Sequence, residues 1–287
     1  MSAVNIPFIM NYNLKVCVLG SGSSGNCTYI ASEHTRLLID AGLSCKETDR
    51  RLNIIGADLA DINALCISHE HDDHISSLKA LYRKSATRKP HGGHAGLKLY
   101  ANSATIEAIE RDENMRGLPW NIFTTGSPFI VGDIKIEPFS VPHDSYDPVG
   151  FVLSRGHSRK DHPERLGIVT DMGLATELIR ERLKRCRILI LEANHDSGML
   201  KDSGRPWPLI QRIAGRQGHL SNDKAAELIT EIAGPELKCV FLAHLSSDCN
   251  RPELAVKAVR DALLKIGRTD VSVKLTYPGK PSDVEEV

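Results

Sequence analysis

Short apolar runs, each ending at a glycine, a polar turn or a charged residue, recur along the chain and predict buried strands. The first run covers residues 14–19, and three strands are expected between residues 128 and 153. The strands gather first and then alternate with helical segments. Further strands are expected over residues 26–30, 36–39, 63–67, 166–170, 188–191, 239–243 and 271–275.

Apolar residues at helical spacing predict amphipathic helices between these strands. Over residues 44–55, Ser44 is the expected N-cap, and Glu47, three residues later, completes a capping box. No linker-like break in composition separates the elements, so we predict a single domain. Further helices are expected through Leu78 and Leu81, and over residues 103–111, 174–184, 221–233 and 251–266.

Composition places the chain among ordinary globular proteins. Its 287 residues, 41% hydrophobic and 25% charged, allow a sizeable core. Lys plus Arg and Asp plus Glu both total 36, so any contact with nucleic acid depends on local basic patches. The seven scattered cysteines indicate reduced thiols rather than a disulfide framework. Without an apolar leader or an apolar stretch of spanning length, we expect a soluble cytoplasmic protein without membrane contact.

The glycine-rich segment 20–25 reads G-x-G-x-x-G and follows a predicted strand. With Asp40 downstream, this pattern is also typical of dinucleotide-binding folds. That interpretation requires a helix at the third glycine, whereas residues 26–30 are strand-like. We therefore predict a tight hairpin in which Ser23, Ser24 and Asn26 face a substrate phosphate.

A concentrated set of metal donors follows the apolar run 63–67. His69 and His71 stand two residues apart and can reach one ion, whereas Asp73 and His74 are adjacent and must point towards a second. Nitrogen and oxygen donors without thiolate suit zinc, manganese or iron. A solvated polar turn is the alternative, and three histidines and an aspartate at this spacing argue against it.

Other candidate donors stand at the ends of later apolar runs, and together they carry a family resemblance. Asp40, His143, Asp171 and His244 each follow such a run. With the H-x-H-x-D-H motif, this ordered set resembles the metallo-β-lactamase superfamily over nearly the whole chain. The resemblance implies an α/β fold in one domain, a four-layer αββα sandwich. We expect an N-terminal extension over residues 1–13, the hydrolase domain over 14–278 and a mobile tail over 279–287.

The same resemblance implies a dinuclear centre. Two divalent ions, Zn²⁺ or Mn²⁺, about 3.5–4 Å apart can share a hydroxide that attacks phosphorus or a carbonyl carbon. Asp73 is then both a ligand and a catalytic residue, and Asp40 is expected to orient a ligand or a bridging water. Metal one is assigned to His69, His71 and His143, metal two to Asp73, His74 and His244, and Asp171 to a bridging position between them.

Two residues outside this ligand set point to phosphodiester chemistry. His219 resembles the extra histidine that phosphodiesterase branches of the family use as a proton donor to the leaving oxygen, although a helix-cap histidine is the alternative. Glu192 is the candidate to orient this imidazole and raise its pKa. An alkoxide that leaves phosphorus needs such an acid more than the leaving group of a lactam or thioester does.

Four segments bring the resemblance closer to one bacterial subfamily, the YycJ/WalJ-like (VicX-like) proteins. The likeness implies a 5′-to-3′ DNA exonuclease with nucleic acid as its substrate. Arg205, Arg212 and Arg216 are candidate phosphate contacts, with Trp207 among them for base stacking and the last two arginines one helical turn apart. An ordinary basic helix is the alternative. The four segments are residues 20–27, 192–196, 218–222 and 244–246.

Other functions stay open at this point. A small-molecule or cyclic phosphodiesterase would share every metal and proton-transfer residue. A thioester or lactam hydrolase is disfavoured by His219 and Glu192, and the complete ligand set argues against a non-catalytic regulatory metal protein. The sequence leaves the native metal, DNA or RNA preference, strand polarity and oligomeric state undetermined.

Overall fold

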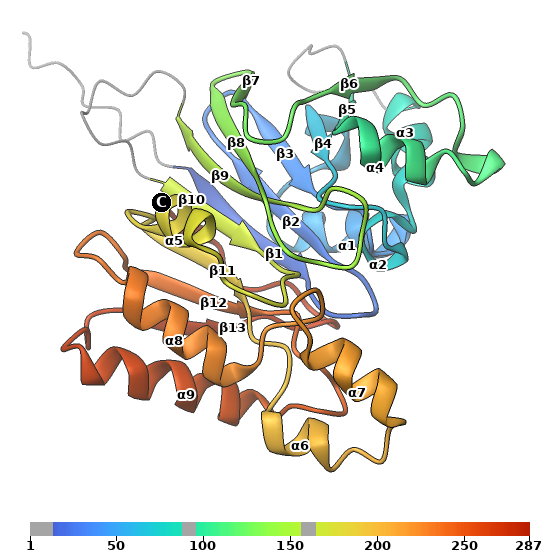
Figure 1. The fold of residues 1–287 in the computed structure, drawn as a ribbon. Coiled ribbons are helices and arrows are strands. Elements are labelled where there is room, and N and C mark those ends of the chain that lie inside the picture. The colour runs from blue at the N-terminus through green and yellow to red at the C-terminus, as the bar shows by residue number, and fades with distance from the viewer. Residues whose placement is uncertain (1–13, 88–95, 156–164) are drawn as a thin grey trace, which may run out of the picture.

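The computed structural model describes residues 14–87, 96–155 and 165–287, which form two seven-stranded sheets packed face to face (Figure 1). The predicted N-terminal extension lies outside the described residues. The first sheet has the order β14 (Glu285–Glu286), β1 (Lys15–Gly20), β2 (Cys27–Ala31), β3 (Arg36–Ile39), β4 (Ala64–Cys66), β5 (Lys98–Ala101) and β6 (Trp120–Ile122). The second has the order β13 (Ser272–Leu275), β12 (Cys239–Ala243), β11 (Ile188–Glu192), β10 (Arg165–Val169), β9 (Val149–Arg155), β8 (Ile134–Ser140) and β7 (Phe129–Val131).

Helices cover the outer face of each sheet, which gives the predicted four layers. The first sheet carries α1 (Cys45–Ile54), α3 (Leu78–Ala86) and α4 (Ser103–Ile109), and the second carries α5 (Glu177–Leu183), α8 (Asn222–Ile232) and α9 (Pro252–Lys265). The short helices α2 (Asp72–Ile75), α6 (Ser197–Lys201) and α7 (Trp207–Ala214) and two 3₁₀ turns, Leu59–Asp61 and Glu113–Met115, lie in connections.

Both faces of the central strands are buried, so successive side chains enter different cores. On β1, Val16 and Val18 pack between the two sheets, whereas Cys17 and Leu19 face the helices of the first sheet. The sequence of β1 is therefore continuously apolar rather than alternating. This burial explains why the runs were readable as strands.

Parallel pairing brings the ends of several strands to one edge of the sandwich. β3 and β4 are parallel in the first sheet, and β10, β11 and β12 are parallel in the second. The carboxyl ends of neighbouring parallel strands lie at the same edge of a sheet. The loops that follow these five strands lie at this edge and contain the predicted donors except His143, which follows β8.

The glycine-rich segment forms the predicted hairpin. β1 and β2 pair antiparallel on either side of it, and a strand rather than a helix follows Gly25. At α1, Ser44 Oγ accepts a hydrogen bond from Glu47 N–H, which confirms the N-cap. The Glu47 carboxylate contacts Arg50 and Arg51.

The predicted mobile tail is wrong. β14 pairs antiparallel with β1, Ser282 N–H donates to the Val18 carbonyl, and Val287 packs into the core between the sheets. Polar composition suggested mobility, but the free edge of β1 offers backbone partners that composition does not show. Helix α6 and strands β5 and β6 were also not predicted. None of the described helices is long and apolar enough to cross a membrane.

Candidate metal centre

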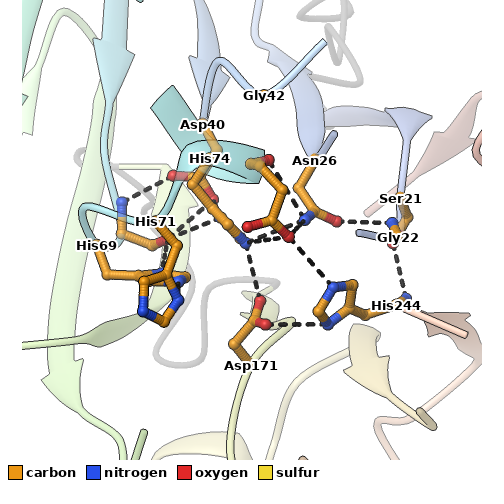
Figure 2. A network of polar contacts seen from close by, with 12 residues as sticks. Ser21, Gly22, Asn26, Asp40, Gly42, His69, His71, His74, Asp171 and His244 are labelled. Carbon is orange, nitrogen blue, oxygen red and sulfur yellow. Dashed lines mark hydrogen bonds and ion pairs between the residues drawn. The ribbon is translucent and has the colours of Figure 1, made fainter. Parts of the chain in front are cut away.

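Three overlapping sets of donor atoms, one of which includes Glu192 and His219, converge at this edge of the sandwich between the loops of the two sheets (Figure 2). With Asp73 they make two neighbouring groups. The chain leaves β4 at Cys66 and turns through His69 and His71 before α2 begins at Asp72. His71 is the N-cap residue of α2, and this short helix brings the centroid of the His74 ring to 4.0 Å from that of the His69 ring. Across the site, β10, β11 and β12 end at or beside Asp171, Glu192 and His244.

The first group contains His69, His71 and His143. His71 Nδ1 lies 3.1 Å from His69 Nε2 and 3.2 Å from His143 Nε2. The remaining nitrogens of two of these rings are engaged, because His69 Nδ1 lies 3.0 Å from Ser68 Oγ and His143 Nδ1 3.1 Å from the Gly218 carbonyl. Such contacts orient the free nitrogens of metal-binding histidines, so these three side chains can hold one ion.

The second group contains Asp73, His74, Asp171 and His244. His74 Nε2 lies 3.1 Å from Asp171 Oδ2, and His244 Nδ1 lies 2.9 Å from Asp171 Oδ1. The other nitrogen of His244 is buried without a hydrogen-bond partner among the described residues and lies 3.4 Å from Asp73 Oδ2. A buried imidazole nitrogen that faces the Asp73 carboxylate without a hydrogen bond fits a cation, and Asp171 lies between the two groups of donors.

The electrostatics of the two groups also fit divalent metal. Burial and the neighbouring His74 hold the pKa of His69 well below its ordinary value, so this ring is neutral, as a ligand must be. Burial opposes ionisation of Asp171, but His244 and His74 outweigh it and hold its pKa well below the ordinary value. At His74, burial lowers the pKa of the imidazole, but the neighbouring Asp40 and Asp171 carboxylates raise it by more, to about 10. The buried carboxylates thus attract positive charge, which a bound cation would supply.

Asp40 lies behind His74 rather than among the converging atoms. Its Oδ2 atom lies 2.7 Å from His74 Nδ1, and its carboxylate accepts hydrogen bonds from Ser68 N–H and Oγ–H at 2.8 and 2.9 Å. The backbone of Asp40 has a φ of 65°, a conformation that L-residues other than Asn and Asp adopt at a cost. The geometry is that of a residue that orients His74.

Asn26 does not face the substrate side, contrary to our prediction. Its side chain is buried, with Nδ2 3.1 Å from Asp73 Oδ2 and 3.0 Å from His74 Nε2. Its backbone N–H donates to the Asp73 carbonyl at 2.7 Å, an approach that only Gly42 permits, since a Cβ there would lie 1.6 Å from the Asp73 oxygen. Asn26 therefore holds α2 and two donor side chains in place.

Glu192 and His219 are neighbours, as predicted. His219 Nδ1 lies 2.6 Å from Glu192 Oε1, and the other carboxylate oxygen accepts from the Met172 and Leu220 N–H groups at 2.8 and 3.1 Å. Burial lowers the pKa of His219, but the Glu192 carboxylate raises it by more. The N-cap of α8 is Ser221, so His219 is not a helix-cap residue.

A pocket of about 200 Å³ opens onto these groups and is called the catalytic pocket below. Ser23 and Arg212, both predicted substrate contacts, line it together with Leu209 and Ile213 of α7. The donor-bearing side chains that reach its surface are His71, Asp73, His143, Asp144, Asp171, His219 and His244.

Four predicted substrate contacts do not line this pocket. Ser24 is exposed but does not line the pocket, and Arg205 pairs with Asp248 at 3.0 Å. Arg216 lies beyond the end of α7, so it does not share a helical face with Arg212. Trp207 is 60% exposed and lines neither the catalytic pocket nor the one beside it.

Sequence reasoning missed Asp144 and Ser68. The Asp144 carboxylate lies 2.6 Å from Arg212 Nη2 and 3.5 Å from His143 Nε2, and Ser68 joins Asp40 to the imidazoles. Each is adjacent in sequence to a predicted histidine, which was the available signal. The contact of Asp144 with α7 depends on a fold of the chain that no local pattern reveals.

Comparisons with known proteins agree with this geometry. Residues 35–244 match the family described as Beta-lactamase superfamily domain. The chain is 34% identical to exodeoxyribonuclease YycJ of Bacillus anthracis over 88% of its own length and 90% of that protein, and 34% identical to exodeoxyribonuclease WalJ of Streptococcus pneumoniae over 95% and 98%. In structure it resembles the metallo-β-lactamase fold protein YhfI from Bacillus subtilis, with a TM-score of 0.69, 17% identity, and coverage of 96% of this chain and all of that one.

Proposed function

The chain belongs to the β-lactamase superfamily and has the metallo-β-lactamase fold, and on that premise we propose that it is a divalent-metal-dependent 5′-to-3′ DNA exonuclease. The observation that carries this proposal is the full-length similarity to two exodeoxyribonucleases, combined with a buried cluster of His and Asp donors that opens onto a pocket.

We assign two divalent ions, Zn²⁺ or Mn²⁺, to this cluster. Its lack of thiolate ligands and its convergent imidazoles and carboxylates support either metal. When bound, the ions supply positive charge that stabilises a phosphoryl transition state. The proposed ligands are those that the sequence indicated, namely His69, His71, Asp73, His74, His143, Asp171 and His244.

The residues of the chain have separate tasks in this proposal. Asp40 orients His74 from behind, and Asn26 positions Asp73. Glu192 holds Nδ1 of His219, which leaves Nε2 to donate a proton to the oxygen that leaves phosphorus. Arg212 is exposed at the rim of the catalytic pocket and is the proposed phosphate contact there. Ser23 lines the same pocket from the turn between β1 and β2 of the first sheet.

Location and partner follow from the same observations. All seven cysteines fall within the described residues and carry free thiols, which supports a reducing compartment and hence a cytoplasmic location. DNA is the proposed partner because the relatives named above act on it, with no membrane involved.

The test incubates metal-reconstituted protein with end-labelled single- and double-stranded DNA, beside bis(p-nitrophenyl) phosphate. Asp171→Ala serves as the control for contaminating nuclease. We expect progressive shortening from the 5′ end that the control lacks. Shortening from the 3′ end would overturn the proposed polarity. If the small ester is cleaved and DNA is not, the protein is a small-molecule phosphodiesterase rather than an exonuclease.

A further inference from the structure

A second pocket lies directly beside the catalytic pocket. It has a volume of about 650 Å³, whereas the catalytic pocket has about 200 Å³. Pockets that hold small organic ligands typically measure about 300–1,000 Å³. The catalytic pocket is therefore suited to a phosphate group between the donors, and the second pocket has room for the larger group attached to it.

The two pockets share one wall. Asp144 and Arg212 line both, and they form an ion pair in which the Asp144 carboxylate lies 2.7 Å from Nε and 2.6 Å from Nη2 of Arg212. The Arg212 side chain is 65% exposed, so this pair is accessible to solvent and to a substrate. The Arg212 guanidinium can therefore donate hydrogen bonds to a phosphate that lies in either pocket.

The lining of the second pocket has the mixed chemistry of a nucleotide. Leu174 and Pro142 supply an apolar wall. Gln211, Arg216 and Gln217 supply two amides and a guanidinium, and the side chains of these three make no hydrogen bond or ion pair with the rest of the described chain. An apolar surface suits a base or sugar, free amides can hydrogen-bond base edges, and a free guanidinium suits a phosphate.

The backbone beside this pocket is closely packed. A Cβ on Gly173 would lie 2.4 Å from the Gly215 carbonyl oxygen, and a Cβ on Gly218 would lie 2.2 Å from the Arg212 and Ile213 carbonyl oxygens. His219 N–H also donates to the Ile213 carbonyl at 2.8 Å. The end of α7 and the loop that bears His219 are thus held as one unit, so the second pocket has a fixed position relative to the proposed proton donor.

We propose that the second pocket is the subsite for the nucleoside next to the scissile phosphate, with Arg212 at the junction and Arg216 on the following phosphate. This inference rests on the proposed function, because it assumes a phosphodiester substrate. It assigns specificity to the end of α7, to the loop that follows it and to Leu174 ahead of α5, rather than to Trp207 or Arg205.

The experiment compares four substrates. Bis(p-nitrophenyl) phosphate has no nucleoside, the p-nitrophenyl esters of thymidine 3′-phosphate and thymidine 5′-phosphate have one on either side, and a DNA oligonucleotide has many. Two variants alter the subsite by different means: Arg216→Ala removes the guanidinium, and Leu174→Asp removes the apolar wall and adds a repelling charge. Arg260→Ala is the matched control, since Arg260 is exposed on α9 and lines neither pocket.

We expect Leu174→Asp to lose about tenfold or more in kcat/KM on one thymidine ester, the size of loss that removal of a base contact gives. Arg216→Ala should lose as much on the DNA oligonucleotide alone, because neither thymidine ester has the following phosphate. Bis(p-nitrophenyl) phosphate should stay within about twofold for both variants, because it has no base, sugar or second phosphate for the subsite to recognise. Equal losses on all substrates, or none on either thymidine ester with Leu174→Asp, would overturn the subsite. If the unaltered protein hydrolyses the thymidine esters but leaves DNA uncleaved, the proposed exonuclease activity is refuted. The comparison of variants on the esters would still test the subsite.

Discussion

His219 Nδ1 and Glu192 Oε1 lie 2.6 Å apart, and this contact determines which nitrogen of the imidazole faces the catalytic pocket. Glu192 is fully buried at the end of β11, and its second oxygen accepts two backbone hydrogen bonds. The same Oε1 atom also lies 3.1 Å from His244 Nδ1, so this fixed carboxylate holds two imidazoles at once. The pair is therefore a fixed proton-donor unit placed beside the metal-donor cluster.

His219→Ala should slow hydrolysis according to the leaving group. General-acid catalysis contributes about 10²–10⁴-fold, so DNA cleavage should fall by that factor, whereas p-nitrophenolate leaves without a proton and its ester should lose about tenfold or less. Single-turnover rates on both substrates, with metal content measured in parallel, provide the check. Glu192→Gln should show the same selectivity to a smaller degree. Equal losses on both substrates would make His219 structural or a metal ligand.

Asp40→Asn should weaken metal binding without unfolding the protein. Asn tolerates the positive φ of residue 40 and has the shape of Asp, but it lacks the charge that holds His74. Loss of such an outer contact typically costs about 10–100-fold in metal affinity. Competition with a chelator, monitored by metal content, gives the affinity, and the circular dichroism spectrum shows whether the fold is intact. Unchanged affinity would remove Asp40 from the proposed support of the site.

The parts of this site that sequence predicted are those set by strands. A buried strand places its last residue at a fixed position, so Asp40, Asp171 and His244 were visible as polar residues after apolar runs. Contacts that depend on how loops cross were not visible: Asp144 meets Arg212 across 68 positions of sequence, and Asn26 meets Asp73 across 47. The last strand was missed for a similar reason, since a two-residue strand has no periodicity to detect.

Asp133→Asn should destabilise the fold in a pH-dependent way. Asp133 lies in the turn between β7 and β8 and accepts hydrogen bonds from Ser32 and Thr35, in the turn between β2 and β3, at 2.5 and 2.7 Å. It thus joins the two sheets. Burial raises the pKa of Asp133, but these two hydroxyls lower it by more, so its folded pKa lies below the unfolded one.

This sign means that the ionised carboxylate stabilises the fold above the unfolded pKa of about 3.9, and that the effect is lost as pH falls through the folded pKa. At neutral pH we expect Asp133→Asn to lower the free energy of unfolding by about 1.5–3 kcal/mol, the range for hydrogen bonds to a charged group. Urea unfolding of the metal-free protein between pH 7 and 3 measures the difference, which should shrink towards acid. Asp261→Asn, at an exposed pair with Lys257, should have little effect at any pH. A difference that stays constant with pH would contradict the assignment.

Removal of residues 279–287 should destabilise the protein and make it self-associate. The truncation removes the Val287 side chain from the core between the sheets and breaks the hydrogen bonds of Ser282 and Val287 to Val18 and Leu14. Burial of a Val side chain contributes about 1.5 kcal/mol or more, and each hydrogen bond about 1 kcal/mol, so we expect a loss of about 3 kcal/mol. The urea midpoint measures this loss.

The same truncation leaves β1 as an exposed edge strand, and such edges pair with other chains. Sedimentation at increasing concentration should therefore show oligomers of the truncated protein that are absent from the full chain. Val287→Ser is the matched control, because it retains the backbone of β14 and loses only the buried side chain: it should be destabilised without self-association. An unchanged urea midpoint after truncation would show that the last strand adds no stability. Oligomers of Val287→Ser would attribute association to the lost side chain instead of the open edge.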